Sequence, residues 1–232
     1  MSFKKLINKI LENLFGVKIY SIRAHGREDW FDIKKTGKTI LTLFDVGANI
    51  GQSAEKFKKA FPQVKIYCFE PVKYLFEKLR KNTINDASIN CYCCAVGSKQ
   101  ETAEIYLNKN DLANSLVKPE YFMDSEIVEV VTIDDFAREN NVSTIDLLKI
   151  DTEGFDLEVL KGADNMLSSG NISFVLVEVS FNPNDKKHTY FIAVFDFLLE
   201  RGYSLYGIYE QIYEPSCGNS LHYANACFCR GI

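Results

Sequence analysis

The sequence predicts a single α/β domain whose mostly parallel sheet is covered by helices on both faces. Three observations support this prediction. Short apolar runs alternate with helical periodicities from about residue 40 onward, and a glycine-rich turn separates the first apolar run from the first helix. The length of 232 residues also fits one large α/β domain better than two small ones.

The N-terminal segment stands apart from this alternation. Residues 2–15 predict an amphipathic helix, because apolar residues recur at spacings of three and four and lysines occupy the other face. We expect the apolar face to pack on the rest of the chain, but a homodimer contact or peripheral contact of residues 1–15 with an anionic membrane would fit the same pattern. We therefore separate an N-terminal helix and lead-in segment, residues 1–38, from a main domain, residues 39–232.

Within the main domain the elements follow in order. The expected strands are residues 40–46, 65–69, 90–96, 147–150, 174–179, 205–209 and 224–229, with shorter ones at 105–106 and 126–131. The expected helices are residues 53–60, 72–81, 133–139, 157–167 and 191–200. Pro62 follows the first of these helices as a stop signal, and Thr132 is placed to cap the third. Strands separated by helices indicate parallel pairing.

Charge and cysteine content restrict the function. Residues 1–38 carry nine basic and four acidic side chains, so the remainder of a chain with net charge −4 carries −9. Such a body is a poor candidate for binding nucleic acid, and we expect no nucleic-acid partner. Seven cysteines without a recognisable signal peptide predict a cytoplasmic protein with reduced thiols. The alternative of membrane contact through residues 1–15 would place this cytoplasmic protein at a membrane surface. No apolar run approaches the roughly 20 residues that span a bilayer.

The strongest local signal is the turn after the first expected strand. Small residues there let the backbone turn sharply and come close to a ligand at the carboxyl ends of the strands. A second acid, Glu70, ends the next strand, where a carboxylate can bind both hydroxyls of a ribose. The candidate cofactor-binding residues of this turn are Asp45, Gly47, Ala48, Asn49, Gly51 and Ser53.

Two details of this turn argue against a dinucleotide. Its glycines, Gly47 and Gly51, have the spacing Gly-x-x-x-Gly rather than Gly-x-Gly-x-x-Gly. Asp45 also places an acid where a pyrophosphate would lie. A sulfonium cofactor has no phosphates and carries an ammonium group, so an acidic turn suits S-adenosylmethionine better. An ordinary tight turn remains the alternative.

A second acidic cluster follows the strand at residues 147–150. Asp151 and Glu153 are expected at the same edge of the sheet, facing the substrate or the methionine end of the cofactor. Each also has a structural explanation, since Asp151 could cap the next helix and Glu153 could be a first-turn charge that the helix dipole favours. Glu178 and His188 are weaker candidates near the same edge. The paired C-x-C segments are expected to pack rather than to bind zinc.

Taken together, these motifs resemble the FkbM-type methyltransferases. The matching segments occur in the order of that family and cover roughly residues 40–180. They are Phe44-Asp-Val-Gly-Ala-Asn-Ile-Gly51, Phe69-Glu-Pro71, Ala95-Val-Gly97, Val131-Thr-Ile-Asp134, Leu148-Lys-Ile-Asp-Thr-Glu-Gly154 and Glu158-Val-Leu-Lys-Gly-Ala163. The chain has Phe155-Asp156 where the family often has a small residue and Glu, so the second acid is shorter.

The resemblance implies a class I methyltransferase fold, a Rossmann-like three-layer sandwich whose seven-stranded, mostly parallel sheet has an antiparallel last strand. It implies S-adenosylmethionine as methyl donor and a hydroxyl acceptor on a carbohydrate or glycoconjugate, such as a surface polysaccharide. By motif match, Glu70 would bind the ribose of the cofactor, and its methionine half would be bound by Asp45, Gly47, Asn49 and Gly51. Pro71, Cys94 and Ala95 complete the cofactor-binding set, with Cys94 beside the adenine. Asp151 would lie at both the cofactor and the reaction centre.

For catalysis, Asp151 is the first candidate for a general base, with Glu178 or His188 as the second and Glu153 beside the reaction centre. No metal is predicted, although Asp151 and Glu153 could together bind a divalent cation in an alternative mechanism. Two rival functions stay open, an N-methyltransferase and a non-catalytic cofactor-binding scaffold. The acceptor itself is expected to be chosen by the N-terminal segment and the C-terminal third.

Overall fold

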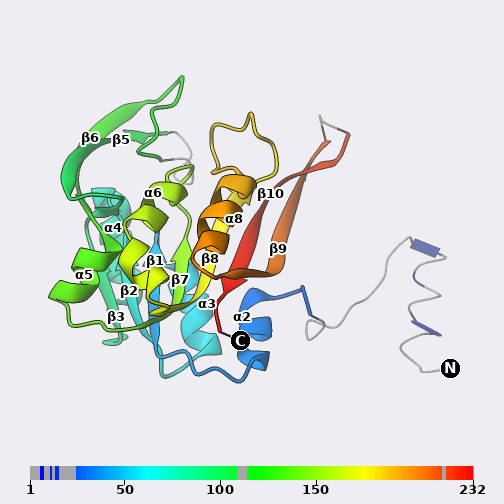
Figure 1. The fold of residues 1–232 in the computed structure, drawn as a ribbon. Coiled ribbons are helices and arrows are strands. Elements are labelled where there is room, and N and C mark those ends of the chain that lie inside the picture. The colour runs from blue at the N-terminus through cyan, green and yellow to red at the C-terminus, as the bar shows by residue number, and fades with distance from the viewer. Residues whose placement is uncertain are drawn as a thin grey trace.

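The computed structural model describes residues 6, 7, 11, 14, 15, 25–108, 114–215 and 218–231 (Figure 1). Most of the helix expected at residues 2–15 lies outside these described residues. Within them, no helix has the length and the apolar content needed to cross a membrane.

Seven strands form the central sheet, in the order β3-β2-β1-β7-β8-β10-β9 (Figure 1). They are β1 (Thr42–Val46), β2 (Lys65–Phe69), β3 (Ile89–Tyr92), β7 (Ile145–Ile150), β8 (Ile172–Ser180), β9 (Ser204–Glu214) and β10 (Ser220–Cys229). The first five pair in parallel, whereas β10, the last strand of the chain, runs antiparallel to both β8 and β9. The predicted mostly parallel seven-stranded sheet with an antiparallel last strand is confirmed.

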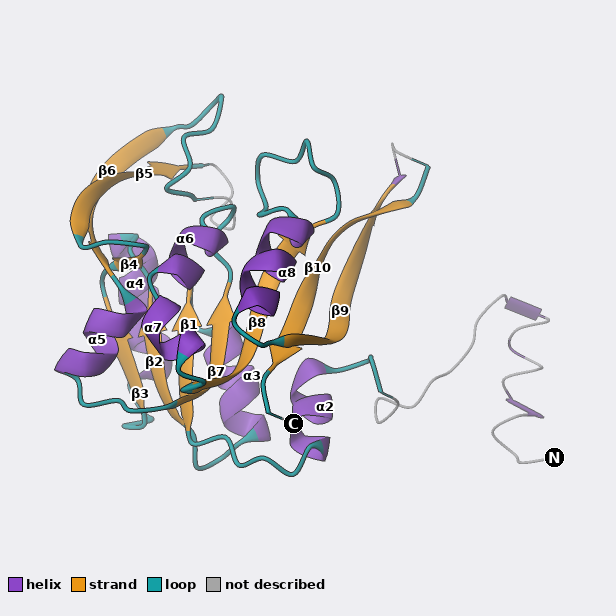
Figure 2. Ribbon diagram, viewed as in Figure 1, coloured by secondary structure: helices purple, strands orange, loops and turns teal. Residues whose placement is uncertain are grey.

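Helices cover both faces of this sheet, which gives the expected three layers (Figure 2). The helices α5 (Ile133–Glu139), α6 (Asp156–Lys161), α7 (Asp164–Ser168) and α8 (Phe191–Glu200) bury residues such as Phe136, Leu160 and Val194 in one apolar core. The helices α2 (Asp29–Lys35), α3 (Gln52–Ala60) and α4 (Lys73–Thr83) lie behind the sheet, where Ile33 and Phe57 enter a second core. The sheet is therefore buried on both sides, as its continuous apolar strands require.

The strand expected at residues 90–96 is divided between two sheets. β3 ends at Tyr92 because its partner β2 ends at Phe69, and the chain then leaves the central sheet. Residues 95–96 form β4 (Ala95–Val96), which pairs with β6 (Asp124–Val131), and β6 pairs with β5 (Glu101–Leu107). The expectation of one strand was wrong because an apolar run does not reveal where the neighbouring strand ends.

The helix expected at residues 157–167 is also divided, into α6 and α7 at Gly162. A Cβ at Gly162 would lie 2.0 Å from the carbonyl oxygen of Gly97, so this bend allows a close backbone approach. The carboxylate of Asp134 then accepts hydrogen bonds from the backbone N–H groups of Asn165 and Met166 at the start of α7. By contrast, α5 and α8 have the predicted limits, and Thr132 caps α5 as expected.

Candidate cofactor and acceptor site

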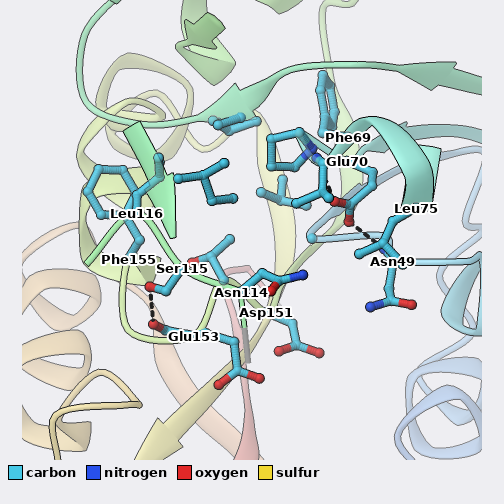
Figure 3. A pocket seen from close by; sticks show the side chains of 18 of the residues that line it. Asn49, Phe69, Glu70, Leu75, Asn114, Ser115, Leu116, Asp151, Glu153 and Phe155 are labelled. Atoms are coloured by element: carbon cyan, nitrogen blue, oxygen red, sulfur yellow. Dashed lines mark hydrogen bonds between the residues drawn. The ribbon is translucent and has the colours of Figure 1, made fainter. Parts of the chain in front are cut away.

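A pocket of about 690 Å³, including the space at its open mouth, lies at the carboxyl ends of β1, β2 and β7 (Figure 3). Its walls are mostly apolar, with Glu70, Asp151 and Glu153 as the acidic exceptions. Among the described residues that line it, none is lysine or arginine. The lining residues are Val46, Gly47, Asn49, Phe69, Glu70, Pro71, Val72, Leu75, Cys94, Ala95, Val96, Ile105, Asn114, Ser115, Leu116, Asp151, Thr152, Glu153 and Phe155.

The turn after β1 is set by backbone contacts. Gly47 has φ of +77°, and a Cβ there would lie 1.9 Å from the carbonyl oxygen of Asp151, so no other residue fits this position unchanged. The N–H groups of Gly47 and Ala48 both donate to the carbonyl oxygen of Phe69 at 3.0 Å, which joins the turn to the end of β2. The turn thereby holds three strand ends together.

The candidate residues of this turn divide into two groups. Gly47 and Asn49 line the pocket. Ala48 is buried, Gly51 precedes α3 with φ of +99°, and Ser53 lies within α3, so none of these three lines the pocket. Their positions suit a structural role in the turn and at the start of α3.

Glu70 lies in the pocket wall with only 5% of its surface exposed. Its Oε2 accepts a hydrogen bond from the N–H of Asn49 and its Oε1 one from the N–H of Val72, both at 2.9 Å. Burial raises the pKa of Glu70 to about 7, although these two backbone bonds favour the charged form. The carboxylate is thus held in one orientation, with further lone pairs free to accept hydroxyl groups.

Beneath the turn, a buried lysine joins two of the predicted acids. The Nζ of Lys149 lies 3.3 Å from Oδ1 of Asp45 and 3.2 Å from Oδ2 of Asp151. Although burial disfavours the ammonium, the two carboxylates raise the pKa of Lys149, so it stays charged. Asp45 is completely buried and does not line the pocket, whereas Asp151 is half-exposed and does. The structure therefore places Asp45 as a partner of Lys149 rather than in a ligand-contacting wall.

On the other side of the pocket, Asp151 and Glu153 follow the end of β7 (Figure 3), and Glu178 of β8 lies beside Glu153. Glu153 follows β7 with φ of +51°, and its carbonyl oxygen accepts a 2.7 Å hydrogen bond from Oγ of Ser115. Burial and the neighbouring Asp151 raise the pKa of Glu153 to about 8. Burial, with Asp151 and Glu153 close by, likewise raises the pKa of Glu178, in β8, to about 9. Burial, which disfavours the charged form, is the larger cause of both pKa shifts, and repulsion between the neighbouring carboxylates adds to it.

Glu178 and His188 do not line the pocket, but they lie beside Glu153 at its edge. Nε2 of His188 is 3.5 Å from Oε2 of Glu178, and its Nδ1 is 2.8 Å from Oδ2 of Asp185. The structure thus brings together four of the predicted residues, Asp151, Glu153, Glu178 and His188, from the ends of β7 and β8 and the loop that follows β8.

Several residues of the site were not among the candidates from the sequence, although Asp156 was noted there as the shorter second acid of the family motif. Asp156 is buried, and its Oδ1 accepts hydrogen bonds from both the N–H and the hydroxyl of Thr152, while its Oδ2 accepts one from Thr189. It therefore ties the loop after β8 to the turn after β7. Lys149 and Asp185 were also missed, because a lysine inside a strand and an acid inside a polar loop carry no distinctive spacing.

The fold and this pocket define a class I methyltransferase domain. Residues 45–205 match the Methyltransferase FkbM domain, and the chain belongs to this family. S-adenosylmethionine is the methyl donor of the family.

Among curated proteins, the chain is 31% identical to "Methyltransferase sdnD" of Sordaria araneosa, over 53% of this chain and 60% of that protein. It is 27% identical to "Hexuronic acid methyltransferase AglP" of Haloferax volcanii, over 62% of this chain and 58% of the relative. It is 23% identical to "2-O-methyltransferase NoeI" of Sinorhizobium fredii, over 60% and 63%. The chain thus spans about three fifths of the length of these relatives.

The crystal structure of N-methyltransferase NodS from Bradyrhizobium japonicum, in complex with S-adenosyl-l-homocysteine, shares the fold. The alignment has a TM-score of 0.50 and 10% identity, and it covers 88% of this chain and 84% of that one. At this identity the similarity concerns the fold alone.

Proposed function

We propose that this chain transfers the methyl group of S-adenosylmethionine to a hydroxyl group of a carbohydrate or glycoconjugate. The observation that carries the proposal is the pair of acidic positions in one apolar pocket. Glu70 lies on one side, fixed by two backbone bonds, and Asp151 and Glu153 lie on the other.

The chemistry of the walls fits this cofactor part by part. Phe69, Leu75 and Ile105 supply apolar surface for an adenine ring, and Glu70 offers a carboxylate to the ribose hydroxyls. Asp151 and Glu153 suit the positively charged methionine end. The same walls would disfavour a dinucleotide, since the described lining residues include acids but no basic side chain to meet a pyrophosphate.

S-adenosylmethionine supplies an electrophilic methyl group on a sulfonium. The protein must hold the acceptor hydroxyl in line with that methyl and take up its proton. We assign the proton transfer to Asp151, and this assignment is supported by a carboxylate that lines the pocket and is half-exposed. Lys149 orients this carboxylate through Oδ2, leaving Oδ1 for the acceptor.

A sugar acceptor is supported by two relatives, one named for hexuronic acid and the other for 2-O-methylation. Three segments at this edge of the sheet also support acceptor binding. The β5–β6 hairpin, the loop between β8 and α8, and the β9–β10 hairpin all extend beyond the carboxyl ends of the parallel strands (Figure 1). Asn114 and Ser115, which follow β5, line the pocket there.

Calorimetric binding of S-adenosylmethionine and S-adenosylhomocysteine, with NAD as control, tests the first half of the proposal. We expect micromolar binding of the sulfur compounds only, weakened at least about tenfold by Glu70→Ala through loss of charge-assisted hydrogen bonds. Glu77→Ala, which removes an exposed carboxylate on α4, is the matched control and should bind normally. Absence of binding to a folded, ligand-free sample would overturn the proposal.

Transfer of a labelled methyl group to a panel of saccharides tests the second half. The panel includes hexuronic acids and neutral sugars, with amines as competitors. We expect the label to appear in a base-stable methyl ether of the saccharide. Transfer to nitrogen instead would identify an N-methyltransferase, and tight cofactor binding without transfer to any acceptor would favour a scaffold.

A further inference from the structure

Three side chains at the acceptor edge of the pocket have the arrangement of metal ligands. Glu153 follows β7, Glu178 lies in β8, and His188 lies in the loop before α8. One donor atom of each lies within 4.8 Å of the donor atoms of the other two. We propose that Glu153, Glu178 and His188 bind a divalent cation through two carboxylates and one imidazole nitrogen.

The orientation of His188 is the first argument. Its Nδ1 lies 2.8 Å from Oδ2 of Asp185, and its ring stacks on Tyr223 with centroids 4.4 Å apart and planes at 15°. The N–H of Lys187 donates to the other oxygen of Asp185 at 2.8 Å, so this acid is itself fixed. A carboxylate that accepts the Nδ1 proton leaves Nε2 as a lone pair, and histidine ligands of metals are commonly oriented in this way.

The direction of that lone pair is the second argument. Nε2 of His188 faces Oε2 of Glu178 at 3.5 Å. The backbone brings the loop close to Glu153, because the left-handed Gly154 lets the carbonyl oxygen of Lys187 come within 3.0 Å of where a Cβ would be. The imidazole nitrogen and two carboxylates therefore meet from three separate segments.

The balance of charge is the third argument. Nearby Asp151 has Lys149 as a partner, and Asp156 accepts hydrogen bonds from two threonines. Within the described part of the chain, the carboxylates of Glu153 and Glu178 accept no hydrogen bond, and His188 is the only ion-pair partner of Glu178. A bound cation would supply a positive partner for both carboxylates in this partly buried space.

These ligands differ from Asp151 and Glu153, the pair that the sequence offered as an alternative metal site. Asp151 turns to Lys149, so the proposed ligands are Glu153 with Glu178 and His188. A second group, Asp185 with His188 and His222, is a weaker choice, because a metal there would compete for the Asp185 oxygen that already holds His188. Two oxygens and one nitrogen suit Mn²⁺, Fe²⁺ or Zn²⁺, with remaining positions for oxygen ligands.

Binding of Mn²⁺ to the chelator-treated full chain, without cofactor, tests the proposal. Calorimetry and loss of the free Mn²⁺ electron paramagnetic resonance signal should show one site per chain with micromolar affinity. Pulsed resonance should show modulation from a coordinated nitrogen, which His188→Gln removes. Glu178→Gln should weaken binding at least about 30-fold, and Asp185→Asn about tenfold as the residue that orients His188.

Two control variants separate this site from its neighbours. His222→Gln should bind Mn²⁺ normally, and loss of binding in this variant would point to the Asp185–His188–His222 group and overturn the proposal. Glu70→Ala should also bind normally, so failure to bind S-adenosylmethionine and failure to bind metal are distinguishable. Thermal unfolding without metal verifies that each variant folds. Absence of Mn²⁺ binding up to millimolar concentration, or binding unaffected by both His188→Gln and Glu178→Gln, would refute the site.

Discussion

The two sides of the pocket are built in different ways. On the proposed cofactor side, formed by the ends of β1 and β2, Glu70 is held by backbone N–H groups and Gly47 by backbone contact with Asp151. On the proposed acceptor side, formed by the ends of β7 and β8, Glu153 and Glu178 meet with little hydrogen bonding and raised pKa values. The cofactor side is therefore defined by geometry and the acceptor side by charge.

This difference suits the tasks proposed for the two sides. A cofactor that is always the same can be recognised by a rigid turn, whose backbone groups do not depend on side-chain rotamers. Proton transfer instead needs groups whose protonation responds to their surroundings. Lys149 connects the two sides, because its ammonium contacts both Asp45 under the turn and Asp151 at the end of β7.

Removing this connection should have the largest effect on stability. Lys149→Met leaves Asp45 buried without its cation, and breaking a buried pair in this way costs about 3–5 kcal/mol of unfolding free energy. Denaturant unfolding measures the loss. The double variant Asp45→Asn with Lys149→Met should recover much of it, because no uncompensated charge stays buried. Equal stability of the single and double variants would show that the unpaired charge of Asp45 does not cause the loss of unfolding free energy.

A methyl group at the turn should be nearly as disruptive. Gly47→Ala combines overpacking against Asp151 with a left-handed backbone, for an expected loss of about 3–4 kcal/mol and of cofactor binding. Gly37→Ala is the matched control, since Gly37 has φ of +76° but no atom within 4 Å of an added Cβ. It should cost only about 1–2 kcal/mol. Similar losses in both variants would mean that backbone strain alone, and not the close approach, determines the turn.

On the proposed acceptor side, Asp151→Asn should act more on turnover than on binding. We expect kcat to fall at least about 100-fold, as for loss of a general base. Affinity for S-adenosylhomocysteine, whose ammonium group loses one nearby carboxylate charge, should fall less than about tenfold. Single-turnover methyl transfer and calorimetry measure the two quantities. A variant with undiminished turnover would remove Asp151 from the mechanism and leave Glu178 or His188 as the base.

The smallest expected effect concerns pH. Because burial raises the pKa of Glu70 to about 7, its carboxyl is protonated at pH 6 and ionised at pH 8 in the cofactor-free chain. If the ionised form accepts the ribose hydroxyls, as we propose, affinity for S-adenosylhomocysteine should fall about tenfold from pH 8 to pH 6. The same shift makes the folded chain lose stability as pH rises from about 4.5 to 7, because the folded state then holds the proton that the unfolded state releases. Glu70→Gln should abolish both the fall in affinity and this loss of stability. A pH dependence that is unchanged in the variant would come from another titratable group.

Much of the architecture was predictable because local patterns agree with the tertiary arrangement. The limits of α5 and α8 follow from an N-cap and from apolar periodicity, and these signals need no information about neighbours. The divisions at Tyr92 and Gly162 were not predictable. They depend on where β2 ends and on the approach of Gly97, which are contacts between distant parts of the chain.

For the site, the sequence by itself determined which residue types stand at the ends of the strands, including the turn glycine Gly47, Glu70 and Asp151. It did so because parallel strands place their carboxyl ends at one edge, so motif order translates into position. Only the tertiary structure decided their partners, since Asp45 turns down to Lys149 and His188 is oriented by Asp185 toward Glu178. Side-chain direction and burial arise from packing between segments that are distant in the chain, and spacing along the sequence does not encode them.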